Sequence, residues 1–340
     1  MTRIFFVTQR VDPRHPTLGA TAAMVRALAA RVDEIVVFAA SASPGALPAN
    51  ARFRSFAGPA QALRGARFEA ALARELARGR PAALLAHMSP VYAVLAAPLL
   101  RPLRVPVLLW FTQQRAGPLL ERAARTVDVI LSVDERSVPV SSAKVRAIGH
   151  GIDTSVFVCT GRHEGAPLRL LSLGRYSEAK GHDLALRALR RLLDEGVDAE
   201  LAVHGEEATP NDVHVRTRLA ALAQELGLGR ARLLDAVPRP DVPALLAETD
   251  VLVNATHGMS ADKVVFEALA SCVPVVAASP VFDSLLPSGL RFPDGDVDAL
   301  ANAVRAAAVL PDEERRRLRR RVEDEHSVGH WADAVLEAAR

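Results

Sequence analysis

The sequence contains few cysteines, lysines and large aromatic residues and has a small net charge. Its 340 residues contain two cysteines, two tryptophans and two tyrosines, and three of its 42 basic residues are lysines: Lys144, Lys180 and Lys263. Two cysteines, Cys159 and Cys272, are too few for a disulfide framework, so we expect a reducing, cytoplasmic setting. A net charge of +3 is too small for the basic surface of a nucleic-acid-binding protein, so nucleic acid is excluded as an expected partner.

Long hydrophobic runs are also missing. The longest uncharged apolar stretch, residues 91–100, contains Pro98 and is shorter than the ~20 residues that a spanning helix needs. The first residues carry no signal-peptide cleavage pattern, so we expect nothing to cross a membrane. The arginine-rich segment 314–325 is interpreted as a solvated helix face; contact with an anionic membrane or a partner protein is the alternative.

Several motifs that common α/β enzymes require are absent. There is no G-x-x-x-x-G-K-[ST] phosphate loop, no G-x-G-x-x-G after the first strand, and no G-x-S-x-G nucleophile elbow. These absences argue against NTPases, Rossmann-type dehydrogenases and α/β-hydrolases. His326 and His330 stand four residues apart but lack the glutamate of a zinc-protease helix, so we expect no metal site there.

Short apolar runs alternate with amphipathic segments along the N-terminal half. Such alternation is typical of a parallel sheet covered on both faces by helices. Buried strands are predicted at residues 3–8, 34–38, 82–86, 106–111, 128–133 and 144–148. Helices are predicted at residues 21–31, 62–78 and 118–125.

A polar, glycine-containing break at residues 158–167 precedes a second alternation of the same kind. Its predicted strands are residues 168–173, 200–204, 231–234, 251–254 and 274–277, and its predicted helices are residues 180–195, 212–226, 242–248, 262–271 and the tail from 296. The expected fold class is α/β, with two doubly wound domains. Ligands bind outside the carboxyl ends of the strands in such sheets, so we expect an interdomain site.

The first positive signal is the segment GRYSEAKG, which follows the strand at 168–173. Gly174 and Gly181 allow a tight backbone there, and Arg175 and Lys180 stand at the entry to a helix. A helix N-terminus favours anions, and the two cations would add charge-assisted hydrogen bonds to a phosphate. A solvated turn with two surface cations is the alternative.

The second signal is Glu267 in the segment DKVVFEALA. Its neighbours in the sequence are apolar, and a carboxylate is seldom buried without partners. Glu267 is therefore predicted to be bound by protein donors or by the hydroxyls of a ligand, and the residues alone do not decide between the two.

The order of these motifs resembles a known family. GRYSEAKG, a strand ending in VHGEE, TDVLVNAT and DKVVFEALASCVPVV follow one another as in the retaining glycosyltransferases of family 4, or glycosyl transferases group 1. In the N-terminal half, the segments VTQRVDPRHPTLG, HMSPVY, VPVLLWFT and IGHGIDTSVF are similar to one bacterial branch of this family.

The resemblance implies the GT-B fold. A Rossmann-like acceptor-binding domain would occupy residues 1–157, a Rossmann-like nucleotide-sugar-binding domain would face it across a cleft at 158–325, and a helix at 326–340 would return to the first domain.

The resemblance also implies an activity and its residues. A hexosyl group would pass from a nucleotide-diphosphate sugar to an acceptor hydroxyl with its anomeric configuration kept, on the front face of the sugar and without a dedicated base, a cofactor or a metal. Arg175 and Lys180 would stabilise the departing diphosphate, and Glu267 would accept hydrogen bonds from the ribose. The other donor-binding positions that the resemblance implies are Gly19, Gly174, Met259, Ser260, Asp262 and Lys263.

Three residues depart from the family pattern. Met259 stands eight positions before Glu267, where the family usually has a first glutamate whose hydrogen bonds a thioether cannot make. Gln113 stands where a histidine is often found, and it cannot be charged. Both put the donor choice or the activity in question. Cys272 stands where the family usually has the glycine of a helix-to-strand turn. A left-handed backbone conformation at that position is less favourable for cysteine than for glycine and would lower the stability of the fold.

Acceptor contacts are less defined than donor contacts. Gln113, His87 and His150 are candidates, with structural roles as the alternative for the two histidines. Arginines in the loops at 10–19, 57–67 and 113–118 suggest a polar, anionic or lipid-linked acceptor. Two other functions stay open: a non-catalytic sugar-nucleotide-binding homologue that acts as a partner subunit, and a nucleotide-sugar epimerase on the same fold.

Overall fold

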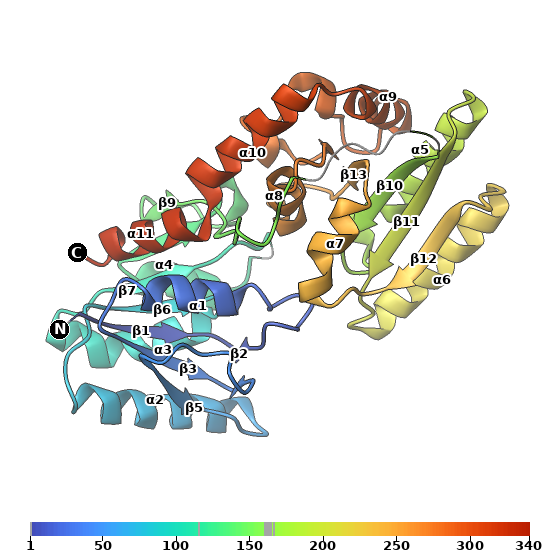
Figure 1. Ribbon diagram of the computed structural model, residues 1–340. Helices are drawn as coiled ribbons and strands as arrows, with labels where there is room; N and C mark the ends of the chain where they lie inside the picture. The colour runs from blue at the N-terminus through green and yellow to red at the C-terminus, as the bar shows by residue number, and fades with distance from the viewer. Residues whose placement is uncertain (1, 115, 160–164, 166) are drawn as a thin grey trace. The chain divides into compact units, whose positions relative to one another are not determined.

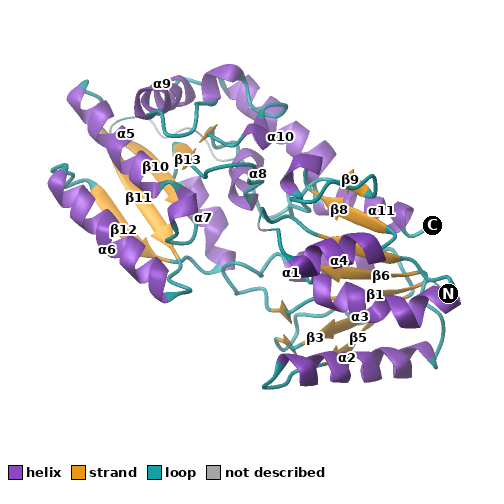
Figure 2. Ribbon diagram, turned by 180° about the vertical axis from the view of Figure 1, so that it is seen from behind, coloured by secondary structure: helices purple, strands orange, loops and turns teal. Residues whose placement is uncertain are grey.

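The computed structural model describes residues 2–114, 116–159, 165 and 167–340. Most of the predicted break at 158–167, and residue 115 of one predicted acceptor loop, lie outside these ranges. The chain divides into two compact units: unit 1 comprises Met1–Asp153 and Glu325–Arg340, and unit 2 comprises Thr154–Asp324. Each unit is a parallel α/β assembly, as predicted, and the alternation of strands and helices is visible in both (Figure 2).

Unit 1 is built on a parallel sheet with the strand order β5-β3-β1-β6-β7-β8-β9 (Figure 1). The order reverses between β1 and β6, which is the switch point of a doubly wound sheet. The strands are β1 (Arg3–Val7), β3 (Glu34–Ala39), β5 (Ala51–Ser55), β6 (Ala83–His87), β7 (Val107–Trp110), β8 (Val129–Ser132) and β9 (Val145–Ala147), and β2 (Arg10–Val11) pairs with β4 (Ser41–Ala42) in a separate short ladder.

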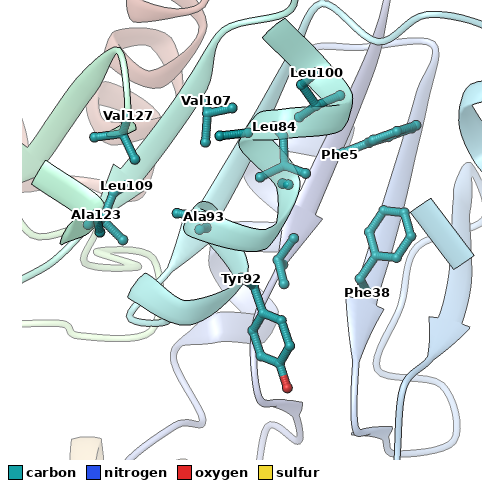
Figure 3. Close-up of a cluster of buried hydrophobic side chains, with 14 of the residues drawn as sticks. Phe5, Phe38, Leu84, Tyr92, Ala93, Leu100, Val107, Leu109, Ala123 and Val127 are labelled. Carbon is teal, nitrogen blue, oxygen red and sulfur yellow. The ribbon is translucent and has the colours of Figure 1, made fainter. Parts of the chain in front are cut away.

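The helices of unit 1 cover this sheet and close its core. They are α1 (Thr21–Ala29), α2 (Gln61–Leu76), α3 (Pro90–Leu100), α4 (Pro118–Thr126) and α11 (Val328–Ala338). Phe5 and Phe38 from the sheet pack into one apolar cluster with Leu84, Tyr92 and Leu100 (Figure 3). Tyr92, from the segment HMSPVY, is thus a core residue. In the part of the chain that the structure describes, no helix combines the length and apolar character needed to cross a bilayer.

Strand β5 was not predicted, because its sequence, ARFRS, lacks an apolar run. It lies at the edge of the sheet and pairs with β3 alone in the strand order. Arg52 bonds Glu34 at 2.8 Å, and Arg54 bonds the fully buried Glu75 at 2.6 Å. Arginines that pair with carboxylates thus take the place of an apolar face.

The C-terminal helix α11 belongs to unit 1 and packs against α1. Trp331 is fully buried, with its ring 5.9 Å from that of Trp110, and Arg31 on the loop after α1 bonds Asp333 at 2.6 Å. Gly151 lies so close to Trp331 that an added Cβ would stand 3.2 Å from the indole ring. The close packing of α11 therefore leaves little room for a side chain at position 151.

Unit 2 is built on a parallel sheet with the order β12-β11-β10-β13-β14. Its switch point lies between β10 and β13. The strands are β10 (Leu168–Leu173), β11 (Ala199–Gly205), β12 (Ala231–Asp235), β13 (Val251–Asn254) and β14 (Val275–Ala277); the helices are α5 (His182–Asp194), α6 (Pro210–Glu225), α7 (Val242–Ala247), α8 (Lys263–Ala270), α9 (Val297–Ala308) and α10 (Asp312–His326), which runs on into unit 1.

A disulfide in unit 2 joins Cys159 to Cys272, across 113 residues of sequence. The sequence predicted a reducing setting, because two cysteines make no framework. The fold nevertheless places their Cα atoms 4.9 Å apart, within the range that a disulfide bridges. Cys272 has the expected left-handed backbone, with φ +59°. The bond ties the end of α8 to the start of unit 2.

We expect the disulfide to be detected by thiol titration of the denatured protein. Protein purified without reductant should expose no reactive thiol in denaturant, and two thiols after reduction. The Cys159→Ser variant should expose one thiol without reduction. Two reactive thiols in the unreduced wild-type protein would show that the cysteines are not paired.

Candidate functional site

The loop after β10 carries the first predicted signal, and a buried tyrosine holds it in place. Tyr176 is fully buried, and its hydroxyl donates to the carbonyl oxygens of Val203 and Leu234, at 3.0 and 2.8 Å. Burial raises the pKa of Tyr176 to about 12, so the hydroxyl stays a donor. Gly205 permits this packing, because an added Cβ would lie 2.7 Å from the tyrosine ring.

Gly181 brings this loop against the end of β13. It has φ +59°, and an added Cβ would collide with the carbonyl oxygen of Ala255. The N–H of His257 also donates to the carbonyl of Ala179 at 2.9 Å. The loops that follow β10 and β13 therefore meet at the switch point of unit 2, where doubly wound sheets bind their ligands.

His182 opens α5 directly behind this loop. It is 3% exposed; its Nδ1 lies 2.9 Å from the hydroxyl of Ser172 and its Nε2 lies 3.3 Å from the carbonyl oxygen of Arg175. Burial, together with the nearby charge of Lys180, lowers the pKa of His182 to about 4. A neutral ring that donates from Nε2 and accepts at Nδ1 satisfies both contacts.

The stability of the protein should therefore depend on His182 below neutral pH. Because the pKa is about 4 in the folded chain and 6.5 for an ordinary solvated histidine, the unfolded chain binds more protons between these values. The contribution is complete above pH 6.5 and is lost as the pH falls toward 4, by about 3 kcal/mol in total.

Urea unfolding of the wild type and of His182→Gln, measured in parallel from pH 7.5 to 4.5, tests this dependence. The difference in unfolding free energy should shrink as the pH falls, because only the wild type has the buried imidazole. A difference that is constant across this range would contradict the assignment.

Lys180 and Asp262 form an ion pair between the two loops. Lys180 Nζ lies 2.7 Å from Asp262 Oδ1, and the side chains are 23% and 11% exposed. The charge of Lys180 and its hydrogen bond hold the pKa of Asp262 well below its usual range, against the opposing effect of burial. The aliphatic stem of Lys180 lies along Gly174, where an added Cβ would stand 3.1 Å from its Cδ.

Arg175 does not share this carboxylate. Its Nε lies 3.6 Å from Asp212 Oδ2, and its side chain is half exposed. Asp212 is itself buried and caps α6 together with Thr209. The two predicted phosphate-binding cations thus lie on one loop, each with its own carboxylate partner.

Glu267 lies on α8 and is 2% exposed. The sequence left open whether protein or ligand groups would bind it, and the structure supplies a protein partner: Arg239 Nη2 lies 2.5 Å from Glu267 Oε1. Arg239 comes from the turn η4 (Arg239–Asp241), and its guanidinium also lies 5.4 Å from the ring centroid of Phe157. Burial lowers the pKa of Lys263 to about 8, with Glu267 opposing the shift and Arg239 adding to it.

Met259 and Gly258 line a pocket in unit 2 of about 420 Å³. The lining also includes Phe292, Asp283 and Arg291, the last two paired at 2.7 Å. Lys180, Asp262 and Glu267 do not line it. The position where the family usually has a glutamate therefore lies beside a partly apolar hollow.

The candidates in unit 1 lie in separate settings. His87 ends β6 at the switch point of that sheet, is 6% exposed, and has its Nδ1 3.3 Å from Thr8 Oγ1 at the end of β1. His150 is 5% exposed and lies near Trp110, while Gln113 is exposed after β7. Gly19 precedes α1, and its N–H donates to the carbonyl of His15 at 2.9 Å.

Sequence reasoning did not identify three residues that support the site. Asn254 and Thr256 both donate to Asp262, at 2.9 and 2.5 Å. They follow a buried strand directly, so the rule for strand ends could have found them. Arg239 lies in the segment VPRPDVP, in which nothing distinguishes it from a surface arginine. Within the described ranges, no group of three or more His, Cys, Asp or Glu side chains is placed to hold a metal ion.

Solved structures share the fold of the whole chain. A glycosyltransferase from Rickettsia africae matches with a TM-score of 0.77 at 13% identity, over 99% of this chain and 97% of its own. The Anabaena protein HepE, solved with UDP and glucose, matches with a TM-score of 0.76 at 15% identity, over 99% of each chain. The fold is that of the GT-B glycosyltransferases, as the sequence predicted.

Part of the sequence of unit 2 is similar to a known family. Residues 167–308 match the family described as Glycosyl transferases group 1, which confirms the resemblance found in the motifs. This stretch contains Arg175, Lys180, Asp262 and Glu267.

Curated relatives match part of the chain. A GDP-mannose-dependent alpha-(1-6)-phosphatidylinositol dimannoside mannosyltransferase from Mycobacterium tuberculosis is 31% identical over 168 residues, which cover 47% of this chain and 41% of the relative. A D-inositol 3-phosphate glycosyltransferase from Corynebacterium aurimucosum is 28% identical over 184 residues, 51% of this chain and 36% of the relative. The matches thus span less than half of these relatives, whose names agree with the predicted enzyme class, a glycosyltransferase.

Proposed function

We propose that this protein is a retaining glycosyltransferase that moves a hexosyl group from a nucleotide-diphosphate sugar to an acceptor hydroxyl. The observation that carries the proposal is the meeting of the loops after β10 and β13 at the switch point of unit 2. There Lys180 lies opposite Asp262, and Glu267 lies on the helix that follows. This is where a doubly wound sheet binds a nucleotide, and it lies within the stretch that matches the family.

In this proposal Lys180 and Arg175 act on the leaving group. The bond between the anomeric carbon and the diphosphate oxygen breaks, and a bond from that carbon to the acceptor oxygen forms. The acceptor proton passes to the donor phosphate. Negative charge grows on the diphosphate as the bond breaks, and preorganised cations stabilise this charge in the transition state. No metal is needed to supply this charge.

Glu267 is assigned to the ribose. Its carboxylate pairs with Arg239 at 2.5 Å, while Oε1 makes no hydrogen bond with the described part of the chain. A carboxylate offers about four acceptor sites, so the pairing with Arg239 leaves acceptor capacity for the ribose hydroxyls. His87, His150 and Gln113 remain candidates for contacts to the acceptor or the sugar.

The donor is proposed to carry UDP or GDP. UDP is bound by HepE, and GDP-mannose is named for the mycobacterial relative. The test is incubation with UDP-glucose and with GDP-mannose, followed by proton NMR of the sugar released to water or to an added alcohol. Retention predicts that the first sugar formed has the α configuration of the donor. A β product would overturn the retaining mechanism, and no consumption of either donor would count against the proposed donors.

A non-catalytic sugar-nucleotide-binding protein is the second candidate. Met259 favours it, because a thioether stands where the family usually has a glutamate. Such a protein would bind a nucleoside diphosphate yet leave every nucleotide sugar intact. Binding without turnover, in the presence of acceptors that related enzymes use, would support this candidate over the first.

A further inference from the structure

The carboxylate of Asp262 is surrounded by donors from both loops of unit 2. Oδ1 accepts from Lys180 Nζ at 2.7 Å and from Ser260 Oγ at 2.8 Å. Oδ2 accepts from Asn254 Nδ2 at 2.9 Å and from Thr256 Oγ1 at 2.5 Å. We propose that Asp262 is a positioning residue that holds the ammonium of Lys180 for the diphosphate, rather than a contact to the transferred sugar. This inference rests on the proposed function.

The hydrogen-bond count argues against a sugar contact. A carboxylate has about four acceptor sites, two on each oxygen. Among the described residues, both oxygens of Asp262 already accept two donors each, and the side chain is only 11% exposed. A sugar hydroxyl that donates to Asp262 would have to displace one of these partners. Lys180, by contrast, directs one of its three N–H groups to Asp262 and is 23% exposed.

The network fixes Asp262 from the sheet side. Asn254 is the last residue of β13, and Ser260 and Thr256 belong to the loop that follows. Three neutral donors orient the carboxylate of Asp262. In the salt bridge with Lys180, only the lysine side chain therefore has to be ordered. A long lysine side chain loses much rotamer freedom when it is fixed, and a rigid partner supplies this order before the donor binds.

The charge of Asp262 opposes the diphosphate that Lys180 attracts. Both act within a few ångströms of the same site, so the carboxylate weakens the binding of the diphosphate while it orders the ammonium. Removal of the charge is therefore expected to change affinity and turnover in opposite directions. A residue that only supports the fold would not do this, and a Lys180→Ala background separates positioning of the ammonium from a sugar contact.

Asp262→Asn is the variant that removes the charge and keeps the shape. Its amide oxygen can face Lys180 and Ser260. Its amide nitrogen can donate to Thr256 Oγ1 and to Asn254 Oδ1, a buried atom that has no hydrogen-bond partner in the described part of the chain. The network can therefore form again after small rotations, and the variant is expected to fold. Its melting temperature is the control.

The experiment compares wild type, Asp262→Asn, Lys180→Ala and the double variant by calorimetric titration with UDP and GDP, and by steady-state kinetics with the matching nucleotide sugar. We expect Asp262→Asn to bind the nucleoside diphosphate about tenfold more tightly and to turn over about tenfold more slowly. In the Lys180→Ala background, Asp262→Asn should not slow turnover further, because the positioned group is gone.

Each other outcome overturns the inference. Weaker binding of the nucleotide sugar with unchanged binding of the diphosphate would make Asp262 a sugar contact. Equal losses in both lysine backgrounds, with a lowered melting temperature, would make it a structural residue. If the wild type binds neither UDP nor GDP, the proposed donors fail and the inference fails with them; if it binds one and the charge has no effect, the inference alone fails.

Discussion

Replacement of Lys180 by alanine is expected to lower kcat/KM for glycosyl transfer about 10³-fold, or by roughly 4 kcal/mol. The ammonium would no longer stabilise the charge that develops on the leaving diphosphate. The fold should survive, because Asp262 keeps Ser260, Asn254 and Thr256 as donors. The measurement is steady-state kinetics together with thermal unfolding of the same preparation.

Arg218→Ala is the matched control for this prediction. Arg218 pairs with Glu178, on the same turn as Lys180, but both side chains are about two-thirds exposed, so the pair contributes little. The control should keep wild-type kinetics. Lys180→Arg should recover only part of the activity, because the close approach of Gly174 to the lysine stem leaves little room for a guanidinium. Full activity in Lys180→Ala would refute its role at the leaving group.

Replacement of Glu267 by alanine is expected to abolish most turnover and also to reduce the unfolding free energy by about 3–5 kcal/mol. The carboxylate is 2% exposed and pairs with Arg239, which is 16% exposed. Its removal takes away the buried carboxylate that pairs with Arg239 and that favours the charged form of Lys263. Urea unfolding measures the loss of stability, and kinetics measures the loss of turnover.

A double-mutant cycle separates the two effects of this substitution. The Glu267→Ala/Arg239→Met variant should lose less stability than the sum of the single variants, because no uncompensated guanidinium remains. Its activity should stay as low as that of Glu267→Ala, since the ribose acceptor is still absent. Additive losses of stability would mean that the pair is not coupled, and recovered activity would remove Glu267 from the site.

The order of strands and helices was predictable because both sheets are parallel and mostly buried. Runs such as residues 251–253 are apolar because each of these strands is covered on both faces. β5 was not predicted, because its Arg52 and Arg54 pair with carboxylates that are distant in sequence. The disulfide was not predicted either, because 113 residues separate its two cysteines and only the fold brings them together.

The sequence identified several residues of the candidate site, but it did not predict which of their side chains pair with one another. Of the three lysines in the sequence, Lys180 and Lys263 lie in unit 2 beside Asp262 and Glu267, whereas the ammonium of Lys144 donates to carbonyl oxygens at the end of α4. The pairing of Lys180 with Asp262 joins loops 82 residues apart and requires the strand order of the folded sheet. The pairing of Arg239 with Glu267 could not be predicted from the sequence either, because Arg239 lies on the separate turn η4.

The most direct test of the proposed function is calorimetric titration of the purified protein with UDP, GDP, ADP and TDP, with and without magnesium. The account predicts that one nucleoside diphosphate binds more tightly than the others and that magnesium does not alter its affinity. Its binding would identify the base of the donor nucleotide. Failure of all four to bind would contradict the diphosphate site at Lys180 and, with it, the proposed transfer reaction.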